Sequence, residues 1–204
     1  MKGLYAITPD VASTQTLTRI VERALEGGVS FLQYRNKLAD SALRAEQAQA
    51  LLRLARAKGV PLIINDDVAL AAAIDADGAH VGRDDGEVAL ARKSLPGKLL
   101  GASCYASLET AHSAVAAGAD HVAFGSIFSS STKPGAKGAD LALFAQARSL
   151  GVPLVAIGGI TAENACLVIA AGADCVAVIA DLFGAPDITG RAAQYQKLFE
   201  KHPK

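Results

Sequence analysis

Three polar side chains recur at every second position where the apolar segment "VSFLQYRNK" ends. They are Gln33, Arg35 and Lys37, an amide followed by two cations. In a β-strand, side chains at alternate positions point to one face of the sheet. Buried charge is unfavourable unless it is paired. Two cations on one wall therefore predict a site for an anion, such as a pyrophosphate accompanied by a metal ion.

Carboxylates follow two other apolar segments. Asp66 and Asp67 come directly after "PLIIN", and Asp84 and Asp85 come after "GAHVGR". Hard carboxylate oxygens beside cations suit Mg²⁺ that is bridged to substrate phosphates. We expect Asp66 and Asp85 to be metal ligands, and Asp67 and Asp84 to be solvated acids or helix caps. The alternative is that all four are ordinary loop acids.

Hydroxyls and glycines supply further binding groups. Ser103 ends the segment "LLGAS", and the segment 129–138, "SSSTKPGAKG", carries several hydroxyls and Lys133. Gly158 and Gly159 follow "LVAI", where exposed backbone N–H groups and the next helix could hold a phosphate. The alternatives are a turn that needs glycine for a positive φ and a solvated loop at 129–138.

Eight short segments rich in β-branched residues alternate with eight Ala-rich segments of helical spacing. This alternation predicts repeated strand–helix units. The expected strands are 4–9, 29–36, 61–66, 78–82, 99–104, 120–127, 153–159 and 174–180. The expected helices are about 13–27, 40–58, 67–76, 86–95, 107–117, 140–150, 161–171 and 188–201.

An internal repeat supports this organisation. "EGGVSFLQ", "DADGAHVG", "AAGADHVAFG" and "AAGADCVAVIA" are versions of one helix-to-strand corner, before the second, fourth, sixth and eighth strands. We therefore expect an α/β fold, a single (β/α)₈ TIM-barrel domain over residues 1–204. A doubly wound open sheet is the alternative. In a barrel the active site lies at the C-terminal ends of the strands, where the polar residues above fall.

Composition narrows the function classes. Of the 204 residues, 51% are hydrophobic and the formal net charge is zero, which argues against nucleic acid or a membrane surface as a partner. Neither a signal peptide nor a membrane span is evident, so we expect a cytoplasmic protein. Odd in number and without metal-like spacing, Cys104, Cys166 and Cys175 are expected to be reduced and largely buried. His80, His112, His121 and His202 lack triad or ligand spacing and are expected to be structural or exposed.

Several rare motifs, in order and at characteristic spacing, resemble the thiamine phosphate synthase family. They are "GLYAITPD", "LQYRNK", "PLIIND", "GAHVGRDD", "GASCY", "AFGSIFSSSTKPGA", "VAIGGITAENA" and "VIAAGADCVAVI". The resemblance implies a (β/α)₈ barrel and a Mg²⁺-dependent transferase in thiamine biosynthesis. It would join 4-amino-2-methyl-5-hydroxymethylpyrimidine diphosphate to 4-methyl-5-(2-phosphoethyl)thiazole, giving thiamine monophosphate and pyrophosphate. Pyrophosphate would leave first, and the thiazole nitrogen would capture the resulting pyrimidine methylene cation.

The resemblance also implies a role for each matching residue. The pyrimidine diphosphate would be bound by Gln33, Tyr34, Arg35, Asn36, Lys37, Asn65, Ser103 and Lys133, of which Arg35, Lys37, Ser103 and Lys133 would be catalytic. The thiazole phosphate would be bound by Ser130, Ser131, Thr132, Gly158, Gly159, Ile179 and Ala180. Mg²⁺ would be held by Asp66 and Asp85. Ala180 stands where family members commonly carry Ser, and Asp67 adds negative charge near the metal.

Three other readings compete. A thiazole tautomerase relative shares the fold but has no use for the Mg²⁺ acids or for all of Gln33, Arg35 and Lys37. A Schiff-base aldolase needs a Lys that can lose its proton, and neither Lys37 nor Lys133 has that setting. A non-catalytic phosphate-binding barrel would keep the Gly158–Gly159 turn without the acids. The partners are thus expected to be small-molecule substrates, and a homo-oligomer remains open.

Overall fold

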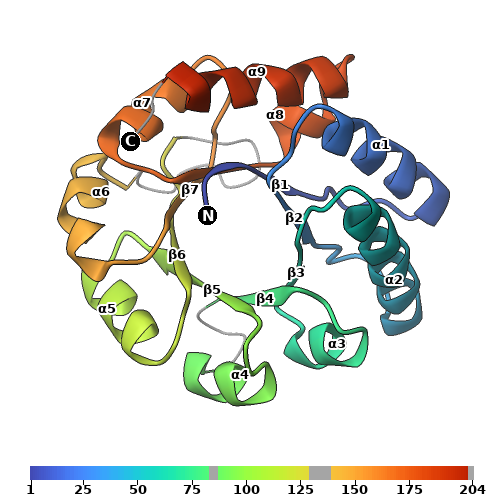
Figure 1. The fold of residues 1–204 in the computed structure, drawn as a ribbon, viewed down its shortest axis with the longest axis horizontal. Coiled ribbons are helices and arrows are strands. Elements are labelled where there is room, and N and C mark those ends of the chain that lie inside the picture. Colours follow the sequence, from blue (N-terminus) through green and yellow to red (C-terminus); the bar gives the residue numbers. More distant parts are fainter. Residues whose placement is uncertain (83–86, 129–138, 202–204) are drawn as a thin grey trace.

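The eight expected strands are all present and close into a parallel barrel. The computed structural model describes residues 1–82, 87–128 and 139–201. Each strand pairs with the next along the chain, and β8 pairs with β1, so the barrel prediction is confirmed and the open sheet is excluded (Figure 1). The strands are Gly3–Ile7 (β1), Phe31–Tyr34 (β2), Leu62–Asn65 (β3), Gly78–Val81 (β4), Leu99–Tyr105 (β5), His121–Phe124 (β6), Leu154–Ile157 (β7) and Cys175–Val178 (β8).

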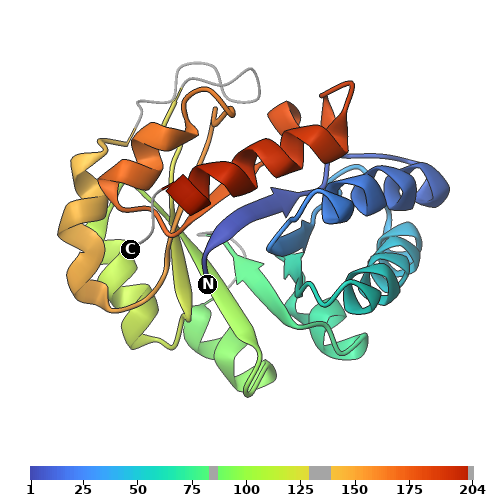
Figure 2. The same cartoon turned by 45° about the horizontal axis from the view of Figure 1, so that its top comes forward.

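Helices surround the ring of strands, with α9 lying beside α1 and α8 (Figures 1 and 2). They are Thr14–Glu26 (α1), Ser41–Ala57 (α2), Val68–Ala73 (α3), Val88–Ser94 (α4), Leu108–Ala116 (α5), Ala142–Gln146 (α6), Ala165–Ala171 (α7), Ala180–Phe183 (α8) and Ile188–Lys201 (α9), with a 3₁₀ turn at Ala147–Leu150. The short helix α8 was not expected. Ile179 leaves the strand conformation, with φ −119° and ψ −80°, so the strand predicted to reach 180 ends at Val178.

Strand alternation separates two apolar cores. Leu4 and Ala6 of β1 face the helices and join the large core between the sheet and the helix layer. Tyr5 and Ile7 of the same strand face the barrel interior, where a smaller cluster forms. Met1 packs against this interior cluster, so the N-terminal residue covers the end of the barrel at which the strands begin, in the middle of the ring in Figure 1.

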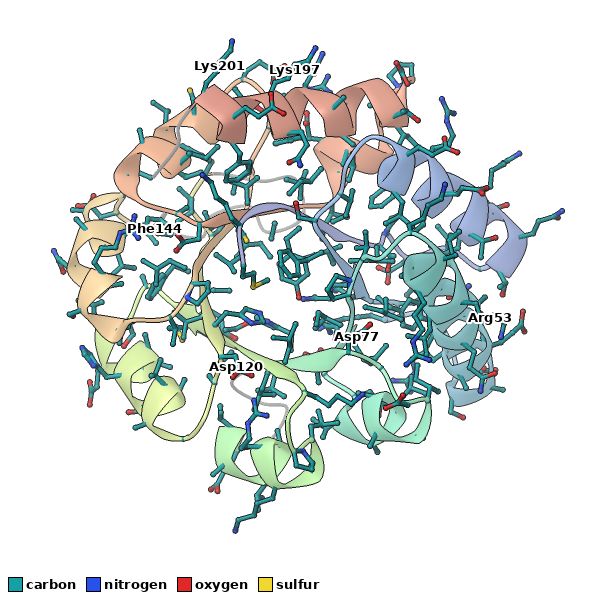
Figure 3. The ribbon with its side chains drawn as sticks, viewed as in Figure 1. Arg53, Asp77, Asp120, Phe144, Lys197 and Lys201 are labelled. Atoms are coloured by element: carbon teal, nitrogen blue, oxygen red, sulfur yellow. The ribbon has the colours of Figure 1, made fainter. Side chains whose placement is uncertain are left out.

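Carboxylates in the repeated corner join neighbouring units. Asp77, Asp120 and Asp174 occupy equivalent places before β4, β6 and β8, and each accepts a hydrogen bond from a backbone N–H of the preceding strand. The acceptor–donor distances are 2.8 Å to Leu62, 2.7 Å to Leu100 and 2.8 Å to Leu154, respectively. In Figure 3, Asp77 and Asp120 lie close to the strands, whereas Arg53, Lys197 and Lys201 point outward. The acid of the repeat therefore has a structural role, because it ties β3 to β4, β5 to β6 and β7 to β8.

Candidate active site

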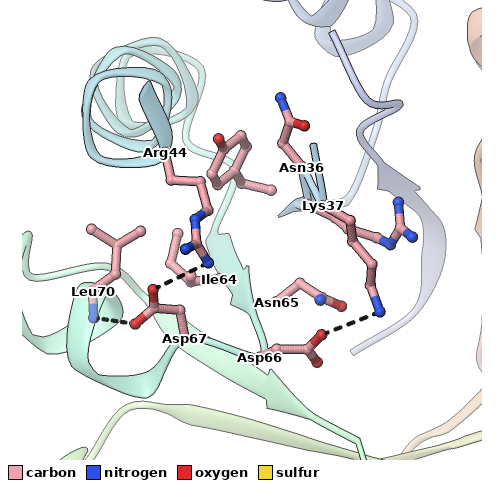
Figure 4. A pocket seen from close by; sticks show the side chains of 10 residues that line it. Asn36, Lys37, Arg44, Ile64, Asn65, Asp66, Asp67 and Leu70 are labelled. Carbon is pink, nitrogen blue, oxygen red and sulfur yellow. Dashed lines mark hydrogen bonds and ion pairs between the residues drawn. The ribbon is translucent and has the colours of Figure 1, made fainter. Parts of the chain in front are cut away.

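A polar pocket lies where β2 and β3 end, at the rim predicted to hold the site (Figure 4). Residues from the loops after both strands line it, together with side chains from the start of α2 and α3. They are Tyr34, Arg35, Asn36, Lys37, Arg44, Ile64, Asn65, Asp66, Asp67 and Leu70. The structure thus brings together most of the described residues that were predicted to bind the pyrimidine diphosphate.

The three alternating polar residues do not share one strand. The strand expected over 29–36 ends at Tyr34, so only Gln33 is placed by the pleat. Arg35 is placed instead by Thr8, whose hydroxyl donates to the carbonyl of Arg35 and accepts from its N–H, both at 2.8 Å. The β1 loop therefore fixes the backbone at which the cationic segment begins.

Asp10, which the sequence did not single out, contacts both cationic residues. Its carboxylate accepts from Nη1 of Arg35 at 3.2 and 3.3 Å and from the backbone N–H of Lys37 at 2.7 Å. The available signal was its position, because "ITPD" follows the first strand and so reaches the same rim.

Two further acid–base pairs line the pocket. Nζ of Lys37 lies 3.8 Å from Oδ2 of Asp66, and Nη1 of Arg44 lies 3.8 Å from Oδ2 of Asp67 (Figure 4). Arg44 belongs to α2 rather than to a strand end, and so the strand-by-strand prediction missed it. Each cation of the pocket thus has an aspartate on a neighbouring loop, which offsets the repulsion among the cations.

Asp66 and Asp67 differ in backbone conformation. Asp66 is left-handed, with φ 62°, and its N–H donates to the carbonyl of His80 at 2.8 Å. Asp67 caps α3 by accepting from the N–H of Leu70 at 2.8 Å, which confirms the predicted helix cap. A non-glycine residue at positive φ is uncommon and is often found at functional sites, so Asp66 is the acid of the pair with the unusual geometry.

Tyr34 and Asn36 use their polar atoms inside the protein. The hydroxyl of Tyr34 donates to Oε1 of Gln47 at 2.9 Å, and burial raises the pKa of Tyr34 to about 12. Nδ2 of Asn36 donates to Val11 and Gln47, and its Oδ1 accepts from the N–H groups of residues 38 and 39. Both side chains thereby shape the loop after β2, and their substrate contacts stay a prediction.

Ser103 lies across the barrel from Gln33, on the interior face of β5. Its hydroxyl is 2.9 Å from Nε2 of His80, a residue expected to be merely structural. His80 and His121 are both buried in the interior, whereas His112 is exposed on α5. Two histidines therefore lie directly beneath the predicted site.

The loops after β7 and β8 form the second half of the rim. Gly158 and Gly159 both have positive φ, 102° and 62°. A Cβ on Gly158 would lie 2.3 Å from Oγ of Ser126, so this turn requires glycine for space as well as for conformation. The backbone of Ile179 and Ala180 turns into α8 at the end of β8.

Asp181 of α8 joins these two loops. Its Oδ2 accepts from the N–H of Ala162 at 3.3 Å, from Nη1 of Arg191 at 3.2 Å and from the hydroxyl of Tyr195 at 2.7 Å. The carboxylate therefore ties the segment after Gly159 to the helix that begins at Ala180. No local sequence pattern indicates this link, because its partners lie in two distant segments, the loop after β7 and helix α9.

Several predicted residues lie outside the described part of the chain: Asp84, Asp85, Ser130, Ser131, Thr132, Lys133 and His202. Their assignments stay predictions. Among residues 1–82, 87–128 and 139–201, no three His, Cys, Asp or Glu side chains are grouped as a metal site. The same ranges contain no helix long and apolar enough to cross a membrane.

The three cysteines do not form disulfides. Cys104 and Cys175 are buried as expected, and Cys166 is half-buried. Burial raises the pKa of Cys104 to about 12. A thiol with so high a pKa is protonated at neutral pH and is a poor nucleophile.

Comparison with known proteins identifies close relatives. The family model described as thiamine monophosphate synthase matches residues 4–182. The chain is 58% identical over 200 residues to the thiamine-phosphate synthase of Methylobacillus flagellatus, covering 98% of this chain and 96% of that one. It is 54% identical over 202 residues to the enzyme of the same name from Aromatoleum aromaticum, covering 98% and 97%.

A solved structure agrees with these sequence matches. The thiamine phosphate pyrophosphorylase from Pyrococcus furiosus superposes with a TM-score of 0.88 at 33% identity, covering 99% of this chain and 97% of that one. The similarity in fold therefore extends over nearly the whole chain.

Proposed function

We propose, on the premise that this chain belongs to the thiamine monophosphate synthase family, that it joins the pyrimidine diphosphate to the thiazole phosphate. The products are thiamine monophosphate and pyrophosphate, and the chain is accordingly a transferase. The observation that carries this proposal is the convergence at one barrel rim of Arg35, Lys37, Asn65 and Asp66. Gln33 and Ser103 face the interior just below them.

The cations of the rim are suited to the diphosphate. Arg35 and Lys37 lie on one loop, where Asp10 pairs with Arg35 and Asp66 pairs with Lys37. When the diphosphate leaves the pyrimidine, negative charge grows on the leaving oxygens. Cations already fixed in place stabilise that charge without a further reorganisation of the site. We assign Lys133 to the same task on the strength of its motif.

Mg²⁺ fits the chemistry of the donor set. Asp66 is a hard carboxylate ligand at the rim beside the cations, and Mg²⁺ is commonly held by one or two carboxylates with substrate phosphates and water. Asp85 would supply the second carboxylate. When bound, the ion would neutralise charge on the diphosphate. A group of three protein ligands is not needed for such a site.

The remaining chemistry is positioning. Gln33 and Ser103 would hold the pyrimidine ring, and the rim would bring the thiazole nitrogen to the methylene carbon from which pyrophosphate departs. The C–O bond to pyrophosphate breaks before the C–N bond to the thiazole forms, so no protein nucleophile is required. The chain would accelerate the reaction by orienting two substrates and by keeping water from the reactive cation.

The thiazole phosphate would lie at the loops after β7 and β8. Gly158 and Gly159 present backbone without side chains, and Ile179 and Ala180 lead into α8 beside them. Barrel enzymes often bind phosphate at these two loops. Ala180 offers only its N–H, so Ser130, Ser131 and Thr132 would supply the hydroxyl contacts.

The decisive experiment measures pyrophosphate release and thiamine monophosphate formation by the purified protein. Both substrates and Mg²⁺ are supplied, with controls that omit each in turn. We expect turnover only when all three are present. Arg35→Met should lower turnover strongly, whereas Arg53→Met, which removes a cation pointing outward from α2 (Figure 3), should not. Binding of the thiazole phosphate without pyrophosphate release would instead support a tautomerase or a non-catalytic barrel.

We also propose a location for the protein. The expectation of a cytoplasmic enzyme with small-molecule substrates and no nucleic-acid partner rests on the formal net charge of zero and on the three free thiols. Gel filtration with light scattering would decide whether the chain is a monomer or a homo-oligomer.

A further inference from the structure

A layer of polar rings fills the barrel interior directly below the rim. Tyr5, His80 and His121 project inward from β1, β4 and β6, and their exposed fractions are 1%, 6% and 1%. The centroids of His80 and His121 are 5.6 Å apart, and those of Tyr5 and His121 are 6.1 Å apart. The three rings therefore form a continuous buried floor beneath the site.

One end of this floor contacts Gln33. Nε2 of Gln33 donates to the hydroxyl of Tyr5 at 2.9 Å, and both side chains are buried. A glutamine amide can rotate by half a turn, which exchanges its donor and its acceptor. The bond to Tyr5 holds one end of the amide in the interior and leaves the other end for a ligand.

The other end of the floor contacts Ser103. Nε2 of His80 lies 2.9 Å from Oγ of Ser103. A serine hydroxyl rotates freely and can donate or accept. The contact with the imidazole therefore fixes the position of the Ser103 oxygen below the site.

Gly101 leaves the space that the two imidazoles of the floor occupy. A Cβ at this position would lie 2.2 Å from Nε2 of His121 and 2.3 Å from Nδ1 of His80. Both imidazoles therefore occupy the space that the side chain of any other amino acid at position 101 would fill. Ser103 lies two positions further along the same strand, so the strand that admits the rings also carries the hydroxyl that His80 contacts.

We propose that Tyr5 and His80 are positioning residues that hold the side chains of Gln33 and Ser103 in place for the pyrimidine ring. The inference rests on the proposed function. An aminopyrimidine presents donors and acceptors at fixed angles, and a site with correctly placed partners discriminates strongly against a mismatched ligand. Gln33 and Ser103 face the barrel interior, and each contacts one ring of the floor.

The test combines single variants with double-mutant cycles. Tyr5→Phe and His80→Leu should each raise the KM for the pyrimidine diphosphate roughly three- to tenfold, the range expected for one hydrogen bond, and leave the KM for the thiazole phosphate unchanged. Tyr5→Phe should add no loss in a Gln33→Ala background, and His80→Leu none in a Ser103→Ala background. His80→Gln, which restores a polar atom near the position of Nε2, should recover part of the loss.

Matched controls separate positioning from folding. Tyr195→Phe removes another fully buried tyrosine hydroxyl, from α9, and His112→Gln changes an exposed histidine. Neither should change the KM for the pyrimidine diphosphate. Losses that simply add in the double variants, or that fall equally on both substrates, would show that the rings only pack and would overturn the inference. A wild-type protein without turnover would overturn the proposed function, and this inference with it.

Discussion

The carboxylate of Asp10, in the loop after β1, contacts both Arg35 and Lys37, in two ways that differ in kind. It accepts from the guanidinium at 3.2 Å, and it accepts from the backbone N–H of Lys37 two residues further on at 2.7 Å. The first contact balances charge and the second sets the path of the loop. A negative residue thus belongs to a site that is expected to bind an anion.

The two contacts of Asp10 can be separated by substitution. Asp10→Ala removes both, so we expect kcat/KM for the pyrimidine diphosphate to fall about tenfold, which corresponds to about 1.4 kcal/mol. Asp10→Asn keeps an oxygen for the N–H of Lys37 and removes the charge, and its loss should be smaller. Steady-state kinetics checks this, with Glu46→Gln on the exposed face of α2 as the control. Equal losses in the two Asp10 variants would show that charge, and not loop path, is what matters.

Substitutions of the neighbouring acids Asp66 and Asp67 should have opposite effects on turnover and on stability. Asp66→Asn preserves a side chain that tolerates the φ of 62°, so it should fold normally and lose its Mg²⁺-dependent turnover. Asp67→Ala removes the cap of α3 and should lower the free energy of unfolding by about 1 kcal/mol with turnover largely kept. Urea unfolding and a Mg²⁺ titration of turnover distinguish the two effects. An Asp66→Asn protein with wild-type Mg²⁺ dependence would remove Asp66 from the metal site.

Alanine substitution of Gly158, in the turn after β7, can be compared with the same substitution of Gly151, before β7. Gly158 and Gly151 both have positive φ, 102° and 69°, so alanine at either should destabilise the fold by about 1 kcal/mol. Only at Gly158 does the new Cβ also meet another residue, Ser126. We expect Gly158→Ala to raise the KM for the thiazole phosphate and Gly151→Ala to leave it unchanged. If both variants raise it equally, the effect comes from lost stability and not from the phosphate site.

Stability should decrease as the pH falls, because of His121. Burial, assisted by the N-terminal ammonium, lowers its pKa from 6.5 to about 4. The unfolded chain therefore takes up a proton between pH 6.5 and 4 that the folded chain does not, and the folded state loses up to about 3 kcal/mol over this window. His80 and Tyr5 are the titratable rings packed against it, and Tyr5 stays neutral because burial raises its pKa.

Urea unfolding at several pH values between 7 and 4 measures this effect. His121→Leu should flatten the pH dependence over that window, whereas His112→Gln, on the exposed face of α5, should leave it as in the wild type. A wild-type slope in the His121→Leu protein would assign the titration to another group.

The fold could be predicted because its signals are local. Corners such as "AAGADHVAFG" recur at each second strand, and a strand-to-helix order of this kind has few compact solutions. The rim residues followed from the same reasoning, because a side chain after a parallel strand must lie at the C-terminal end of the barrel. Asn65 and Asp66 were found in this way.

The supporting residues could not be predicted, because their contacts join distant segments. Tyr5 meets Gln33 across 28 positions, and His80 meets Ser103 across 23. The sequence around a single buried tyrosine or histidine does not indicate which distant residue it contacts. Only the register of the strands brings Tyr5 to Gln33 and His80 to Ser103. The same applies to Asp181, whose partners lie 10, 14 and 19 positions away.

The acids at the helix-to-strand corners have a consequence for how such a barrel can be assembled. Asp77, Asp120 and Asp174 each accept a hydrogen bond from the strand that precedes them in the chain. Each of these three pairs of strand–helix units therefore contains the hydrogen bond that joins its two strands. Duplication of such a pair along the gene would therefore carry the bond between its two strands with it.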